Sequence, residues 1–236
     1  MTTSQPPIYT TGVDALDLVL GGGLPAGSTT IIAGLPGTGK TVLAEQFLFA
    51  NATEATPALY LTTMSEPLEK IIRYLQRFSF FDPERLPSAI HYQDIGQVIR
   101  TRGIEALPLV VEELIADHGA VFVVIDSLKA MHDLCRDPVA FRIALFDLGR
   151  VLTAAGTTAL LVGEYGPTDI ATLPEFAVAD GVVELSNRAY GVGCPSIFCG
   201  EELSGRGMLG EEERTTPWVV GRRARWARRV ASSGLS

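Results

Sequence analysis

Eight consecutive residues constrain the fold of this chain more than any other feature. They read Gly34-Leu-Pro-Gly-Thr-Gly-Lys-Thr41 and fill every fixed position of the phosphate-binding pattern G-x-x-x-x-G-K-[ST]. An apolar, β-prone run at residues 29–33 precedes the motif, and a helical pattern begins near Thr41. A strand, a glycine-rich loop and a helix in this order predict an α/β fold with an anion site at the edge of its sheet.

The residue types in the loop indicate how phosphate is held. Glycines at 34, 37 and 39 allow the backbone to curl so that its N–H groups point at phosphate oxygens, next to the positive end of the following helix. Lys40 is a candidate catalytic residue that is predicted to reach the β- and γ-phosphates, and the Thr41 hydroxyl is predicted to contact Mg²⁺. An accidental lysine in a glycine-rich loop is the alternative, and the flanking strand and helix argue against it. The predicted nucleotide-binding residues are Gly34, Leu35, Pro36, Gly37, Thr38, Gly39, Lys40, Thr41 and Val42.

A second candidate site residue follows another apolar run. Asp126 comes directly after residues 121–125, Val-Phe-Val-Val-Ile, so its carboxylate is expected at the carboxyl edge of the sheet. An acid there holds the magnesium ion in P-loop proteins. The alternative is a helix cap, because Asp-Ser commonly starts a helix. The phosphate loop upstream favours the metal role.

The rest of the chain alternates short strands with longer helices, which is typical of βαβ units in a mostly parallel sheet with helices on both faces. Phe141, Leu145, Leu148 and Leu152 recur at helical spacing and predict one face packed on the sheet. The predicted strands are residues 29–33, 58–62, 90–93, 121–125, 158–162 and 182–185. The predicted helices are residues 41–50, 67–78, 109–117 and 138–155.

Charge divides the chain into an acidic body and a basic end. Residues 1–213 carry 13 Lys and Arg against 27 Asp and Glu, whereas residues 214–236 carry six Arg and no acid. An acidic body repels a polyanion, so nucleic-acid binding is not favoured, although the basic end keeps it open. The chain shows neither a signal-peptide pattern nor an apolar run long enough to span a bilayer, and we expect a cytoplasmic protein without membrane contact.

Several further segments resemble the KaiC branch of the RecA-type ATPases. They occur in the family's order and cover residues 9–190. The resemblance implies a single RecA-like P-loop domain that binds ATP and Mg²⁺, forms homo-oligomeric rings or filaments, and holds nucleotide at the subunit boundary. The segments are Thr11-Gly-Val-Asp-Ala-Leu-Asp17, Leu20-Gly-Gly-Gly-Leu-Pro-Ala-Gly27, Val123-Val-Ile-Asp-Ser-Leu128, Glu164-Tyr-Gly-Pro167 and Phe176-Ala-Val-Ala-Asp-Gly-Val-Val-Glu-Leu185.

The sequence departs from the family at the group that activates water. Relatives usually carry two adjacent glutamates after the second strand, and Met64 and Ser65 occupy those positions here. Neither side chain serves as a general base near neutral pH. Glu66 is the remaining catalytic candidate. Its other interpretation is structural, because it precedes Pro67 at a predicted helix start, where an acid favours the helix dipole.

The second departure lies in residues 191–236, an atypical Gly- and Arg-rich tail that we expect to be partly disordered. Relatives carry a Lys-x-Arg-Gly element there that reaches the neighbouring subunit's nucleotide. The chain has Ser204-Gly-Arg-Gly207, so Arg206 is a candidate catalytic residue acting in trans, with a solvated surface arginine as the alternative.

Three functions follow from these observations. The first is a slow, Mg²⁺-dependent ATPase that acts as a nucleotide-dependent regulatory or assembly switch, with a protein partner as one expected contact. The second is an ATP-binding regulatory module without significant hydrolysis. The third is a DNA-associated, recombinase-like ATPase, which would need a basic face that the acidic body does not favour.

Overall fold

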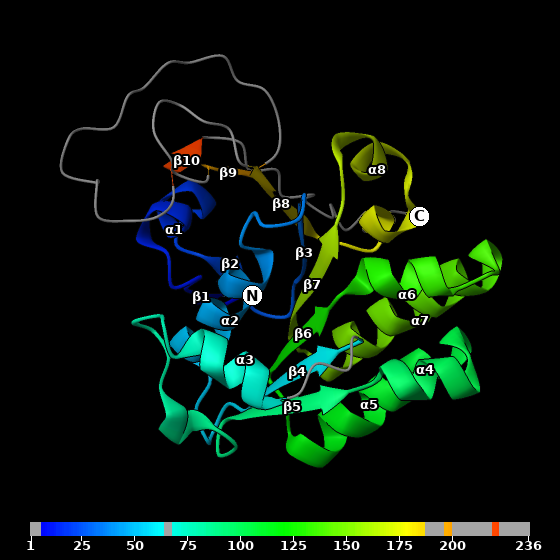
Figure 1. The fold of residues 1–236 in the computed structure, drawn as a ribbon, viewed down its shortest axis with the longest axis horizontal. Coiled ribbons are helices and arrows are strands. Elements are labelled where there is room, and N and C mark those ends of the chain that lie inside the picture. The colour runs from blue at the N-terminus through cyan, green and yellow to red at the C-terminus, as the bar shows by residue number, and fades with distance from the viewer. Residues whose placement is uncertain (1–5, 64–67, 187–195, 200–218, 222–236) are drawn as a thin grey trace, which may run out of the picture.

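The computed structural model describes residues 6–63, 68–186, 196–199 and 219–221. Its main feature is an eight-stranded sheet in the order β10-β9-β8-β3-β7-β6-β4-β5 (Figure 1). The six strands from β8 to β5 run parallel, which confirms the predicted α/β class, while β9 pairs antiparallel with β8. The strands of this sheet are β3 (Thr29–Gly34), β4 (Ala58–Thr62), β5 (Ile90–Asp94), β6 (Phe122–Asp126), β7 (Thr158–Glu164), β8 (Gly181–Ser186), β9 (Ser196–Cys199) and β10 (Val219–Gly221).

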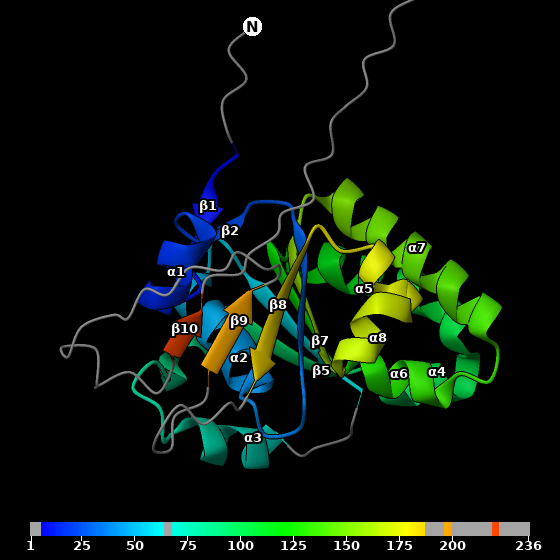
Figure 2. The ribbon, with the colours of Figure 1, turned by 90° about the horizontal axis from the view of Figure 1, so that it is seen from above.

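Helices cover both faces of the sheet (Figure 2). Helices α1 (Asp14–Leu20), α2 (Lys40–Asn51) and α3 (Leu68–Leu75) lie on one side, where β1 (Ile8–Tyr9) and β2 (Leu24–Pro25) form a small antiparallel pair. The other side carries α4 (Gly96–Arg102), α5 (Leu107–His118), α6 (Leu128–Leu134) and α7 (Pro138–Ala155). A further helix, α8 (Pro167–Thr172), follows β7. No helix in these described ranges is long and apolar enough to cross a bilayer.

The alternation of side chains along the strands builds two cores. Ile32 of β3 and Val124 of β6 pack in the layer with α2, whereas Ile31 and Ile125 pack in the layer with α5 and α7. Successive residues of a strand point to opposite faces, so strands buried on both sides read as continuous apolar runs. This double burial explains the uninterrupted hydrophobicity from which the strands were predicted.

Helix α7 illustrates how local sequence sets an element's limits. The Asp137 carboxylate accepts hydrogen bonds from the backbone N–H groups of Val139 and Ala140, and Pro138 occupies the first turn. The helix ends at Ala155 and is capped by Gly156, whose φ of 68° is left-handed. The predicted inner face is confirmed, since all four of its apolar residues are at most 1% exposed: Phe141, Leu145, Leu148 and Leu152.

The structure also contains elements that the sequence did not predict. Helices α1, α4, α6 and α8 are six or seven residues long, and two strands, β9 and β10, extend the sheet beyond residue 190. Short helices have little intrinsic stability and form when tertiary packing supports them. Their sequences therefore carry weak periodic signals.

Candidate functional site

The phosphate-binding motif forms the turn between β3 and α2. Gly34 ends the strand with φ +150°, and a Cβ atom there would lie 2.3 Å from the carbonyl oxygen of Leu185. Gly39 caps α2 with φ 90°, a left-handed conformation that favours glycine. A side chain at either position would strain the backbone. The glycines of the motif are thus required by the path of the chain.

Two side chains cross the inside of this loop. The hydroxyl of Thr38 and the ammonium group of Lys40 both donate to the carbonyl oxygen of Leu35, at 2.9 and 2.8 Å. Burial lowers the pKa of Lys40, and the nearby carboxylates of Glu164 and Asp126 oppose that shift. Lys40 therefore presents a largely desolvated positive charge to the loop. Such a charge attracts an anionic group more strongly than a charge surrounded by water does.

The predicted metal residues lie together. The hydroxyl of Thr41, in the first turn of α2, donates to Oδ2 of Asp126 at 2.7 Å. Asp126 is the last residue of β6, so its carboxylate emerges at the carboxyl edge of the sheet. Hydroxyl and carboxylate oxygens suit Mg²⁺, which keeps several waters and takes only one or two protein ligands in phosphate sites. The donor set thus fits this ion.

A cavity of about 530 Å³ opens beside the loop and across the ends of β4, β6 and β7. Lys40 of α2 and Asp126 of β6 both line it, so charges of both signs face the same cavity. The residues that line it are Gly37, Gly39, Lys40, Thr41, Val42, Glu45, Tyr60, Thr62, Ile71, Tyr74, Asp126, Ser127, Lys129, Ala130, Asp133, Gly163 and Glu164. Most of the predicted loop residues are therefore brought to one cavity together with the acid of a distant strand.

Behind this cavity lies a set of buried polar side chains that the sequence did not predict. Tyr60 of β4 donates its hydroxyl to Asp126, and Tyr92 of β5 donates to Glu45 of α2, both at 2.7 Å. Burial raises the pKa of Glu45 to about 8, although the hydrogen bond from Tyr92 opposes the shift. A signal was present in the sequence: an acid within the apolar stretch of residues 42–50, one helical turn after Thr41.

Four residues singled out in the sequence lie outside the described part of the chain. They are Met64, Ser65, Glu66 and Arg206. The roles of Glu66 and Arg206 remain predictions. Of the described residues on either side of Glu66, Thr62 and Ile71 line the cavity.

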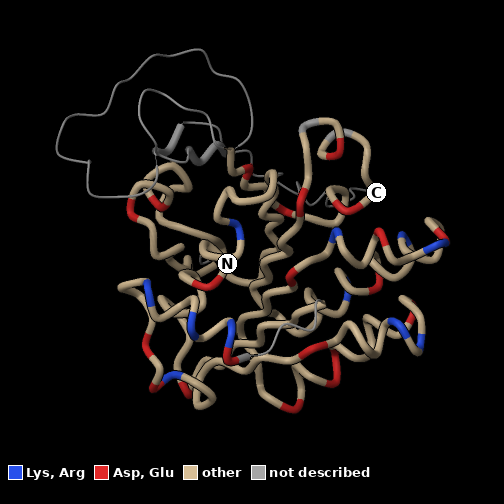
Figure 3. Tube along the Cα trace, in the orientation of Figure 1, with Lys and Arg blue, Asp and Glu red and all other residues tan. Residues whose placement is uncertain are grey.

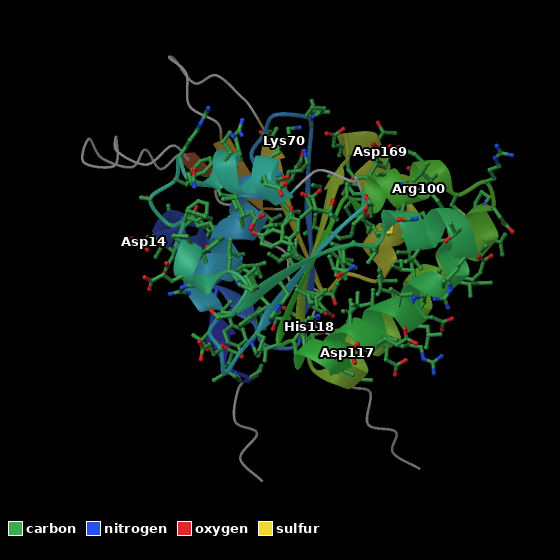
Figure 4. All side chains as sticks on the ribbon, turned by 60° about the horizontal axis from the view of Figure 1, so that its bottom comes forward. Asp14, Lys70, Arg100, Asp117, His118 and Asp169 are labelled. Carbon is green, nitrogen blue, oxygen red and sulfur yellow. The ribbon has the colours of Figure 1, made fainter. Side chains whose placement is uncertain are left out.

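Other groups of titratable side chains lie away from the cavity lining. His91 and His118 contact each other with ring centroids 4.3 Å apart, and Figure 4 shows His118 at the end of the molecule opposite Lys70 and Asp169. His132 pairs at 2.8 Å with Glu175, an acid that is fully buried. The described residues contain no cluster of three or more His, Cys, Asp or Glu side chains suited to a metal ion.

Basic and acidic positions are interspersed over the described residues (Figure 3). Helix α3 carries both Lys70 and Glu69, and Arg150 of α7 lies 3.4 Å from Asp147. Mixed charges of this kind offer a polyanion no continuous basic face in the described part of the chain.

Comparison with known proteins places these features in a family. Residues 9–195 match the family described as "ATPase: KaiC". A UPF0273 protein from Methanopyrus kandleri is 28% identical over 65% of this chain and 66% of its own length. The circadian clock oscillator protein KaiC of Picosynechococcus is 32% identical over 76% of this chain, which spans only 37% of that protein.

A solved structure supports the fold independently. The KaiC-like protein of the archaeon Pyrococcus horikoshii superposes with a TM-score of 0.67 over 81% of this chain and 88% of its own, at 23% identity. At this identity the similarity concerns the fold alone. The arrangement of strands and helices predicted from the motif order is therefore shared with a protein of similar size.

Proposed function

Because the chain belongs to the KaiC family of ATPases, we propose that it binds ATP with Mg²⁺ and is a slow ATPase whose nucleotide state acts as a regulatory or assembly switch. One observation carries the proposal: the phosphate loop, Lys40, and the Thr41–Asp126 pair border the same cavity. A triphosphate needs donors for its oxygens and a site for its cation, and this cavity offers both.

Each residue has a defined part in this proposal. The backbone N–H groups of residues 37–41 and the ammonium of Lys40 bind the phosphate oxygens, with Lys40 moving its hydrogen bond from the Leu35 carbonyl to the nucleotide. Thr41 and Asp126 would hold the magnesium ion, which would neutralise charge on the nucleotide phosphates. Glu66 orients and deprotonates the attacking water, and Arg206 stabilises charge from a neighbouring subunit.

A second function rests on one specific observation. Met64 and Ser65 replace the acid pair that relatives of this type carry, and neither takes up a proton near neutral pH. The chain is then an ATP-binding regulatory module that senses nucleotide without significant hydrolysis. The DNA-associated alternative has less support, because the described residues present interspersed charges. Assembly into a homo-oligomer, a protein partner and a cytoplasmic location belong to the proposal as well.

The test is to measure ATP binding and phosphate release with the same purified full-length protein. Binding of Mg²⁺-ATP is followed by calorimetry and release by a phosphate sensor, over a range of protein concentrations. Lys40→Ala is the disabling variant, and Lys70→Ala, an exposed lysine of α3 outside the cavity lining, is its matched control. Glu66→Gln tests the proposed base.

The outcomes separate the hypotheses. Turnover that requires Glu66 and rises with protein concentration supports an assembly-dependent ATPase. Binding that requires Lys40, without phosphate release, supports the binding module. Equal ATP affinity in wild type and Lys40→Ala, or no affinity in wild type, would overturn the proposed site, because the loop amides alone do not replace a full positive charge.

A further inference from the structure

The carboxylate of Asp126 is oriented by two donors on one oxygen. The hydroxyl groups of Thr41 and Tyr60 both donate to Oδ2, each at 2.7 Å. Thr41 comes from the phosphate loop, whereas Tyr60 comes from the middle of β4, a strand that contributes no residue to the predicted metal site. Two donors from different elements restrict where this carboxylate oxygen can lie.

Tyr60 is suited to be a permanent donor. It is only 3% exposed, and a phenol hydroxyl carries its proton near neutral pH. Its partner in the sheet register is Tyr92 of β5, and the two rings stack with centroids 5.1 Å apart. Neighbouring side chains on one sheet face support each other in this way.

Tyr92 is held in turn by Glu45. The Tyr92 hydroxyl donates to Oε2 of Glu45 at 2.7 Å, and Glu45 lies one helical turn after Thr41 on α2. The contacts therefore close a circuit: Thr41, Asp126, Tyr60, Tyr92, Glu45, and back along the helix to Thr41. Helix α2 and strands β4, β5 and β6 are joined through it.

This circuit is costly as a purely structural device. Glu45 is fully buried, and its Oε1 has no hydrogen-bond partner among the described residues. An incompletely satisfied buried acid destabilises a fold, and an apolar side chain would fill the same space without that cost. Polar networks of this kind do, however, hold a group in one fixed geometry.

We propose that Tyr60, supported by the Tyr92–Glu45 pair, is a positioning residue that holds Asp126 ready for a divalent cation. The inference rests on the proposed function, because it assumes that Thr41 and Asp126 bind the cation of a nucleotide. Outer-shell partners of metal ligands commonly contribute about 10- to 100-fold to metal affinity. Tyr60 would have such a role although it was recognisable in the sequence only as a member of a buried strand.

The test removes single oxygen atoms. Tyr60→Phe deletes the donor to Asp126 but keeps the ring and its stack, so the core volume is preserved. Tyr165→Phe is the matched control, because the Tyr165 hydroxyl also donates to a buried acid, Glu175, yet neither residue lines the cavity. Mn²⁺ affinity of the full-length protein with a non-hydrolysable ATP analogue is measured from the spin resonance signal of free Mn²⁺. Affinity for the analogue in EDTA is measured separately.

Tyr60→Phe is expected to lose roughly tenfold in Mn²⁺ affinity, while its affinity for the analogue in EDTA and its circular dichroism stay at wild-type values. Tyr165→Phe should bind Mn²⁺ as wild type does. An unchanged Mn²⁺ affinity in Tyr60→Phe overturns the inference alone, whereas a wild type that binds neither analogue nor Mn²⁺ overturns the proposed function too. Should Tyr60→Phe not fold, Tyr92→Phe is measured instead. It must lose Mn²⁺ affinity, by less than the roughly tenfold loss expected of Tyr60→Phe, for the inference to stand.

Discussion

Glu45 makes the stability of this protein depend on pH in a direction opposite to that of most acids. Its pKa rises from 4.5 to about 8, chiefly through burial, with the charge of Asp126 adding to the shift. The folded chain therefore binds this proton more tightly than the unfolded chain does. The stabilisation is fully present below the unfolded pKa of 4.5 and is lost as pH rises through the folded pKa of about 8.

The size of the effect follows from the shift. A pKa raised from 4.5 to about 8 changes the unfolding free energy by at most about 5 kcal/mol between low and high pH, at about 1.4 kcal/mol for each pKa unit. Between about pH 6 and about pH 8.5 the wild type should lose on the order of 2 to 3 kcal/mol of unfolding free energy through Glu45. Glu45→Gln is neutral at every pH and still accepts the Tyr92 hydrogen bond, so it should lack this loss.

The assay is urea unfolding followed by circular dichroism, with EDTA present so that bound cations do not contribute. Wild type, Glu45→Gln and Glu84→Gln are compared at both pH values. Glu84 is exposed, and its variant should follow the wild type. Parallel pH dependence in wild type and Glu45→Gln would refute the reasoning, because it would mean that Glu45 does not retain its proton in the fold.

Three further predictions concern the cation site, the loop and the core. Asp126→Asn keeps the shape of the side chain and its acceptor oxygen but removes the charge, so Mn²⁺ affinity should fall about 100-fold with little change in thermal midpoint. Gly34→Ala should cost about 2 kcal/mol or more in urea unfolding, because its Cβ would lie 2.3 Å from the Leu185 carbonyl oxygen. Gly119→Ala, with positive φ but no atom within 4 Å, should cost only about 1 kcal/mol. Leu148→Ala, at 1% exposure, should lower the unfolding free energy by about 2 to 5 kcal/mol; a loss below about 0.5 kcal/mol would contradict its place in the core.

The sequence predicted those helices and strands whose apolar pattern lies entirely within their own residues. Strand β4 and helix α7 have the predicted limits, because a strand buried on both faces is a short continuous apolar run and a helix buried on one face repeats its apolar residues every three or four positions. The helix predicted at residues 109–117 is two residues longer at its start, where Leu107 and Pro108 extend α5. Terminal turns depend on caps and neighbours as well as on periodicity.

The sequence by itself determined the phosphate loop, since strand, glycines, lysine and helix are adjacent in the chain and their geometry is local. It also placed Asp126 at the end of a buried strand. Only the tertiary structure decided that Tyr60, Tyr92 and Glu45 meet behind that carboxylate. These residues come from three elements up to 47 positions apart. Their contact follows from the strand order and the packing of α2 on the sheet, because side chains distant in sequence become neighbours only when those elements pack together.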